Sequence, residues 1–199
     1  DTPHGEATVR YDDEGVPTVA ADDEASLYFA VGYVHAADRL FQMDLIRRRM
    51  RGELSAAVGE QTVESDLFHR QMDFAAGAEA NWEVISGTPA GAAVEGHAAG
   101  VEAFRERQSN PVEFRLLGYE PDPWTPVDSM LIEKQIAWGL TGDFTSLRRA
   151  TIADALGPET AERIAPRRYD HDVPILREQQ PDVSFTGGAD GSSTAEGRR

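Results

Sequence analysis

The stretch from Val9 to Gly59 constrains the fold more than any other part of the sequence, because a short extended hairpin precedes a charged helix. Asp22 or Asp23 can cap this helix, and Gly52, directly after an arginine-rich turn, is a good stop signal. A helix that only covered a core would not need charges on several of its faces. Here the charges stand among large apolar side chains: Asp38, Arg39, Asp44, Arg47 and Arg48 among Leu40, Phe41, Met43, Leu45 and Ile46.

Two of these charges, Asp38 and Arg39, have apolar residues on all sides in the sequence. We therefore expect them to pair with neighbouring groups, or with groups of a partner chain, in a buried network. The simpler interpretation is a pair of exposed helix charges, which contributes only about 0.3–0.5 kcal/mol. Gly32, near the middle of the same helix, could mark a break in it.

The remaining pattern predicts a mainly α chain with a short N-terminal β-hairpin. Residues 7–21 alternate and turn at 12–15, and Pro17 favours an edge or irregular strand. Further helices are expected over residues 55–58, 66–86, 89–108, 146–156 and 159–165, and an irregular segment over 110–122.

One more helix start is well marked, since Thr125 can cap, Pro126 suits the first position and Asp128 lies in the first turn. The helix that follows runs to about Leu140 and is apolar around most of its circumference, which predicts burial. By composition we expect strands at 1–21, one helical domain over 22–176, and a flexible tail or spacer at 177–199.

Charge excludes some partners. Asp plus Glu number 35 against 19 Lys plus Arg, which gives a net charge of −16. Such an acidic surface repels nucleic acids and anionic lipids. The acidic surface also indicates adaptation to high salt. There the Debye length falls to about 3 Å, so the repulsion between surface carboxylates is screened. No run of about eighteen apolar residues is present, so no membrane span is predicted.

Two motifs carry a family resemblance. GVPTVAA at 15–21 followed by GYVHAADRLFQMDLIRRRMRG at 32–52, and PVEFRLLGYEPDPWTP at 111–126, are similar to segments of the penicillin acylase family. Thr18 and Ala37 depart from residues common in that family, where neither position is catalytic. In the second motif we expect Trp124 to anchor an irregular crossing by packing. The resemblance covers roughly residues 8–165.

The resemblance implies the α-chain portion of an αββα N-terminal-nucleophile hydrolase. The catalytic serine would then be the N-terminal residue of a separate β chain, and this chain would carry no catalytic residue and no signal peptide. The implied reaction is hydrolysis of linear amides, with β-lactam side chains or N-acyl homoserine lactones as substrates and an exported or extracellular location. A different class of function is a non-catalytic helical binding or scaffold domain derived from such a chain.

The resemblance also indicates a pocket wall. In the family, the segment matching IAWGLTGDFTSL at 136–147 lines the acyl pocket. The residues at the matching positions are Ile136, Gly139, Leu140 and Phe144, although each could equally be an ordinary core residue. Apolar walls suit an acyl group, since a buried methylene contributes about 0.8 kcal/mol.

No cofactor or metal is expected. Many family members bind calcium through a glutamate that follows the serine of this turn, and Leu147 stands there instead. Because calcium requires oxygen ligands, this leucine puts such a site in doubt. The five histidines (His4, His35, His69, His97 and His171) lack zinc-ligand spacing, and His35 is expected to be a hydrogen-bonded structural residue.

Overall fold

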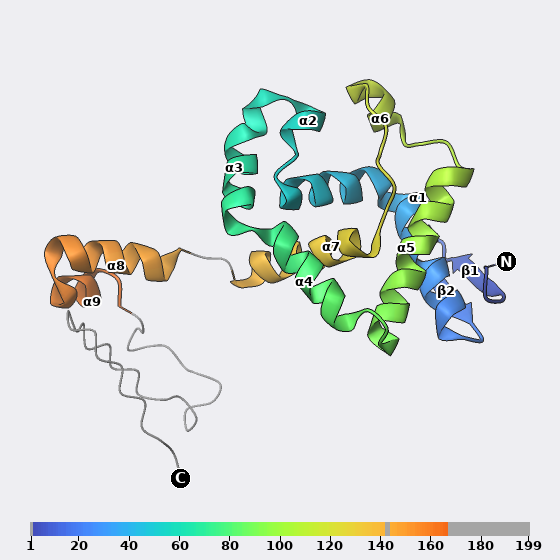
Figure 1. The fold of residues 1–199 in the computed structure, drawn as a ribbon, viewed down its shortest axis with the longest axis horizontal. Coiled ribbons are helices and arrows are strands. Elements are labelled where there is room, and N and C mark those ends of the chain that lie inside the picture. Colours follow the sequence, from blue (N-terminus) through green and yellow to red (C-terminus); the bar gives the residue numbers. More distant parts are fainter. Residues whose placement is uncertain (1, 142–143, 167–199) are drawn as a thin grey trace, which may run out of the picture. The chain divides into compact units, whose positions relative to one another are not determined.

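The computed structural model describes residues 2–141 and 144–166. The chain forms two compact units, residues 1–142 and 143–199, each of which is described by itself. The first contains β1 (Ala7–Tyr11), β2 (Pro17–Ala21), α1 (Glu24–Arg51), α2 (Ser55–Val58), a short 3₁₀ helix (Glu60–Thr62), α3 (Val63–Met72), α4 (Phe74–Ile85), α5 (Pro89–Arg107), α6 (Val112–Leu117) and α7 (Pro126–Thr141); the second contains α8 (Thr145–Leu156) and α9 (Pro158–Ile164) (Figure 1).

The prediction of a mainly α fold with an N-terminal hairpin is therefore confirmed. The domain ranges 1–21, 22–176 and 177–199 stay predictions, and the tail over 177–199 lies outside the described residues. In the second unit, α8 and α9 pack against each other, and Arg149 donates a 2.6 Å hydrogen bond to Glu162.

The hairpin has the predicted turn. β1 and β2 pair antiparallel with Val9 opposite Val19. Within the turn, Oδ1 of Asp12 accepts hydrogen bonds from the backbone N–H groups of Glu14 (3.1 Å) and Val16 (2.7 Å). Pro17 stands at the first position of β2, where proline is tolerated because a strand end needs fewer ladder bonds.

Helix α1 has the predicted ends but a different break. Oδ1 of Asp23 accepts a 2.8 Å hydrogen bond from the backbone N–H of Ser26, so Asp23 is the cap. Gly52 ends the helix in the left-handed region (φ 69°, ψ 43°), which glycine adopts without strain. The kink lies at Arg39 (φ −143°, ψ 17°), so the prediction of a break at Gly32 is wrong.

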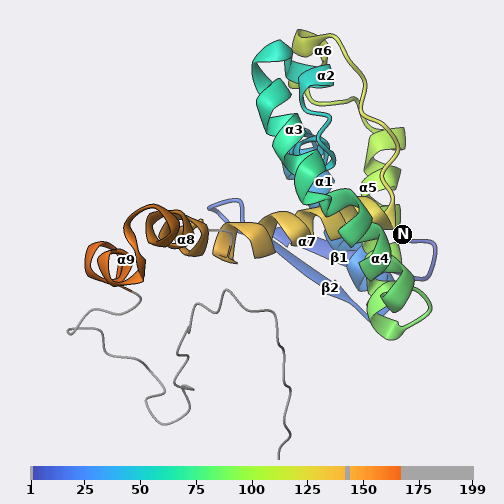
Figure 2. The ribbon, with the colours of Figure 1, turned by 60° about the vertical axis from the view of Figure 1, so that its left-hand side comes forward.

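Gly32 serves a helix crossing instead. A Cβ atom on Gly32 would lie 2.8 Å from the carbonyl carbon of His97, and one on Gly100 would lie 2.8 Å from that of Phe29. The main chains of α1 and α5 therefore touch, and no side chain fits between them. This contact fixes the spacing of the two helices that pack most extensively in the first unit (Figure 2).

Two further predictions need correction. The helix expected over 66–86 is two helices, α3 and α4, because Asp73 adopts a left-handed conformation (φ 55°) that aspartate tolerates better than most residues. The segment 110–122, expected to be irregular, contains the short helix α6.

Burial along α7 also differs from expectation. Leu131 in its first half is fully buried, but Ile136 and Leu140 in its second half are exposed. One side of that second half packs through Trp138 on Phe68 and Phe74. The apolar pattern predicted burial correctly for the first half only, because a pattern does not tell whether the covering surface belongs to the same unit.

Candidate functional site

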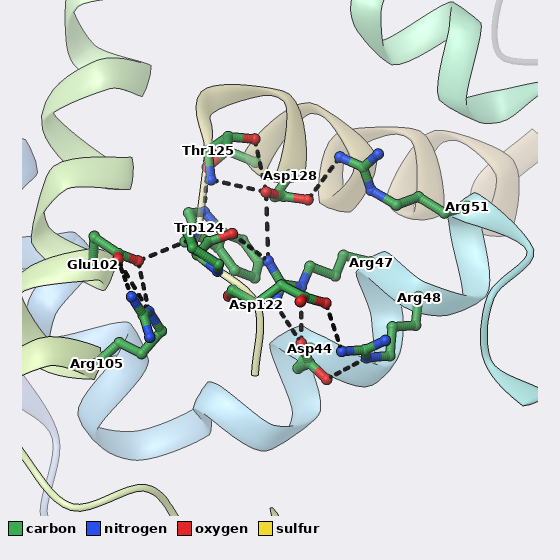
Figure 3. Close-up of polar contacts among 12 residues, drawn as sticks. Asp44, Arg47, Arg48, Arg51, Glu102, Arg105, Asp122, Trp124, Thr125 and Asp128 are labelled. Carbon is green, nitrogen blue, oxygen red and sulfur yellow. Dashed lines mark hydrogen bonds and ion pairs between the residues drawn. The ribbon is translucent and has the colours of Figure 1, made fainter. Parts of the chain in front are cut away.

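Asp44 of α1 is the centre of a buried ionic network (Figure 3). Arg47 donates to its Oδ1 from Nε (2.8 Å) and from Nη2 (2.6 Å). Oδ2 accepts from Nε of Arg48 (2.8 Å) and from the hydroxyl of Tyr119 (2.8 Å). Donors therefore occupy both oxygens, which is the condition under which a buried carboxylate is tolerated.

The charges of this network shift the pKa values of its members. Burial raises the pKa of the Tyr119 hydroxyl, and its hydrogen bond to Asp44 raises it further. Burial lowers the pKa of the Arg48 guanidinium, but its hydrogen bond to Asp44 and the charges of Asp44 and Asp122 outweigh burial and raise it. Tyr119 is therefore neutral and Arg48 charged throughout the working pH range.

A second carboxylate, Asp128, joins α1 to the start of α7. Nη1 of Arg47 lies 3.5 Å from Oδ2 of Asp128, and Nη2 of Arg51 donates to Oδ1 at 3.0 Å. Oδ2 also accepts from the backbone N–H (2.8 Å) and the hydroxyl (2.7 Å) of Thr125. The predicted helix start is thus confirmed, although the Thr125 hydroxyl donates to Asp128 instead of capping the helix as an acceptor.

The network also holds the crossing segment that precedes α7. Arg47 donates to the carbonyl oxygens of Asp122 (2.7 Å) and Pro123 (2.9 Å). The backbone N–H of Trp124 donates to Glu102 of α5 at 2.9 Å, and the ring of Trp124 is buried, as predicted for an anchor. A hydrogen bond from Arg105 holds the pKa of Glu102 below its usual value. The arrangement therefore fixes α7 relative to α1 and α5.

A hydrogen-bonded chain with two histidines links the same three helices. Nε1 of Trp124 donates to Oγ of Ser129 (3.1 Å), which lies 3.3 Å from Nδ1 of His97. Nε2 of His97 lies 3.1 Å from Nδ1 of His35, which confirms His35 as a hydrogen-bonded residue. Burial and the neighbouring His35 lower the pKa of His97 to about 4, so the His97 imidazole is neutral near pH 7.

The predicted pocket residues lie on the surface of their units. Ile136 is 59% exposed, Leu140 is 81% exposed and Phe144 is 41% exposed. A Cβ on Gly139 would meet no atom within 4 Å. Ile136, Gly139 and Leu140 share the second half of α7, and Phe144 belongs to the second unit. None of the four is a core residue of its unit, and their role as a pocket wall stays a prediction.

Among the residues that the structure describes, Asp38 and Arg39 are not part of a buried network. Both are exposed, and within the described residues neither makes an ion pair or a side-chain hydrogen bond. The expectation that they pair with neighbours in the chain is wrong. The buried network uses Asp44, Arg47 and Arg48 instead, and their i, i+3 and i+4 spacing is the sequence signal that could have singled them out.

The expectation that no metal is bound stays a prediction. Leu147 on α8 carries no oxygen ligand, and Asp143 lies outside the described residues. No group of three or more His, Asp or Glu side chains within residues 2–141 and 144–166 could hold a metal ion. In the same residues, no helix combines the length and apolar character needed to cross a membrane.

Comparison with known proteins gives a consistent result. A family model described as penicillin amidase matches residues 6–198. The chain is 32% identical over 163 residues to Penicillin acylase 2 proenzyme of Pseudomonas sp. (strain SE83), covering 81% of this chain and 20% of that protein. It is 30% identical over 171 residues to the acyl-homoserine lactone acylase QuiP of Pseudomonas aeruginosa, covering 84% of this chain and 20% of that protein.

The likeness extends to three dimensions. The chain resembles a chain in the solved structure of a thermostable penicillin G acylase from Alcaligenes faecalis, with a TM-score of 0.66 and 26% identity over 90% of this chain and 98% of that chain. By contrast, the chain spans about a fifth of the length of the curated relatives described above.

Proposed function

This chain belongs to the penicillin amidase family, and from that premise we propose that it is the α subunit of an amidohydrolase that cleaves linear amides. Its substrates are β-lactam side chains or N-acyl homoserine lactones, the two classes that the names of its relatives indicate. In this role the chain supplies scaffold and pocket wall, and a partner chain supplies the reactive groups.

The lengths of the relatives support a subunit role. The matched proenzyme is about five times longer than the region it shares with this chain, which covers 20% of it. The matched chain in the crystal structure is covered to 98%, so a polypeptide of about this extent exists there as a separate chain. A division of the enzyme into a short and a long polypeptide accounts for both values.

The observation that carries the proposal is the exposed apolar end of α7. Ile136 and Leu140 are large apolar side chains that the first unit leaves in water, and Gly139 between them leaves open space. Fixed by the ion pairs of Asp128, the helix presents these residues from a rigid base. An acyl group held between this surface and a partner chain would bury apolar area on both sides.

The chemistry then follows from the family resemblance. The N-terminal serine of the partner chain attacks the amide carbonyl, and its own α-amine accepts the proton directly or through water. Donors of the partner chain stabilise the tetrahedral oxyanion. The C–N bond then breaks, the amine leaves with the proton that the α-amine had accepted, and water releases the acid from the acyl-enzyme. This assignment requires no acid or base from the chain described here.

The test is hydrolysis by the complete gene product. Purified enzyme is incubated with phenylacetyl amides, with aliphatic acyl amides and with N-acyl homoserine lactones of graded acyl-chain length. The released amine is measured. Cleavage of at least one series, abolished when the N-terminal serine of the partner chain is replaced by alanine, supports the proposal. Folded, two-chain protein that cleaves none of them contradicts it and favours a non-catalytic scaffold domain.

We further propose that the protein is adapted to high salt, from its net charge of −16. Screening at molar salt weakens repulsion between carboxylates. The melting temperature is expected to rise between dilute buffer and molar potassium chloride, and an unchanged value contradicts the proposal.

A further inference from the structure

The exposed residues around the kink of α1 form a polar surface, here called the kink face: His35, Ala37, Asp38, Arg39 and Gln42. Ala36 and Leu40 lie between these residues in the sequence and are buried in the core of the first unit. The helix is thus held by its buried side, and the side chains of the kink face point away from that core.

The charges on this face differ from three ion-paired arginines of α1 and resemble Arg49, which is exposed and has no ion pair within the described residues. Further along the helix, Arg47, Arg48 and Arg51 each bind a carboxylate. Asp38 and Arg39 bind none of the described residues. In the first unit both side chains are left to solvent, so any group that pairs with them when this face is covered comes from outside that unit.

Hydrogen bonds connect the kink face to the neighbouring helices. The ring of His35 is tied through Nδ1 to His97, which is tied in turn to Ser129 of α7. Nε2 of His35 has no hydrogen-bond partner within the described residues, and the residue is exposed. A fixed imidazole therefore stands one turn before a free carboxylate and a free guanidinium.

We propose that the kink face is a docking surface for the partner chain, which places a carboxylate against Arg39 and a hydrogen-bond donor against Asp38. This inference rests on the proposed function, since it names where the partner of that enzyme binds. The occupant is argued from length, because four-fifths of the matched relatives lies outside the region they share with this chain. It is argued also from charge, since covering Asp38 or Arg39 without an opposite group would leave a buried, unpaired ion.

Photo-crosslinking of the full gene product tests the location. Benzoyl-phenylalanine is introduced at Gln42 on the kink face. A second variant carries it at Leu140 in the proposed pocket wall, and a control variant carries it at Glu106, which is exposed on α5. The expected result is a crosslink from Gln42 to a peptide outside residues 1–199. Crosslinks from Leu140 but not Gln42 overturn the inference and leave the proposed function standing. If no second polypeptide associates and no amide is cleaved, both fail.

A charge swap tests the chemistry. Asp38→Arg is compared with Glu106→Arg, since each position is followed directly by an arginine on an exposed helix surface. Asp38→Arg is expected to weaken association of the two chains at least about tenfold, measured by dilution and size-exclusion chromatography, as one buried charge contact is lost. The inference is overturned if both variants associate with the partner chain as well as the wild type does. It is also overturned if both lose association equally, because the loss would then come from the changed net charge and not from a contact at Asp38.

Discussion

The Asp44 carboxylate and the Arg47 guanidinium lie 2.6 Å apart, and almost nothing of either side chain reaches solvent. Through Arg47 this pair contacts both the crossing segment and the start of α7, which Arg51 also binds.

Replacing Asp44 by alanine is expected to lower the free energy of unfolding by about 3–5 kcal/mol, because Arg47 and Arg48 lose their shared anion inside the fold. Urea unfolding followed by circular dichroism measures the change. The control is Asp13→Ala in the exposed hairpin turn, for which a change within about 0.5 kcal/mol is expected. If the two variants unfold alike, the network does not stabilise the fold.

Acid is expected to destabilise the protein through His97. Its folded-state pKa is about 4 against 6.5 for the free side chain, so between these values the unfolded state binds a proton that the folded state does not. The free energy of unfolding therefore shows no loss from His97 above about pH 6.5. It falls as the pH drops towards 4, by at most about 3 kcal/mol.

The measurement is the free energy of unfolding in urea from pH 7.5 to 4, with His97→Gln as the comparison. Glutamine keeps hydrogen-bonding capacity but does not titrate, so the variant should show a shallower loss over this range. His35 faces His97 from α1 and Ser129 faces it from α7. A parallel pH dependence in the two proteins would show that His97 is not responsible.

Gly32→Ala is expected to cost about 1–3 kcal/mol, since its Cβ would overlap the main chain of α5 near His97. The matched control is Gly139→Ala, where the new Cβ meets no atom and helix propensity favours alanine by up to about 1 kcal/mol. Thermal or urea unfolding separates the two cases. A Gly32 variant as stable as the wild type would mean that the helices separate easily.

Leu140→Ala tests the pocket wall. Because Leu140 is 81% exposed in its unit, its loss should change stability of the isolated fold by less than about 0.5 kcal/mol. If it lines the acyl pocket, kcat/KM for long acyl chains should fall about tenfold relative to short ones. Leu116→Ala on α6, at 78% exposure, is the control and should leave the preference unchanged.

The elements of this fold were largely readable from local signals. Asp23, Gly52 and the pair of Thr125 with Asp128 mark helix ends by hydrogen bonds to near neighbours, so the sequence contains both partners. The hairpin turn is local in the same way. Asp73 was missed because a left-handed aspartate leaves no mark that distinguishes it from an ordinary helical one.

The site was less readable because its contacts are distant in sequence. Gly32 looks like a helix break until Gly100 and the main chain of α5 are known. Asp38 and Arg39 look equivalent to Asp44 and Arg47 by composition, and before the fold is known only the i, i+3 spacing of the second pair favours an ion pair there. For Ile136 and Leu140, the apolar pattern of α7 predicted contact with other apolar groups. It did not tell which chain supplies those groups.

The touching main chains of α1 and α5 restrict how such a protein can diverge. Two helices spaced by their backbone atoms cannot be brought closer by exchanging side chains, and any side chain added at Gly32 or Gly100 forces them apart. Helix α7 is held differently, by the side chains of Arg47, Arg51 and Trp124. Replacing side chains can therefore loosen the hold on α7, while the spacing of α1 and α5 stays set by their backbones.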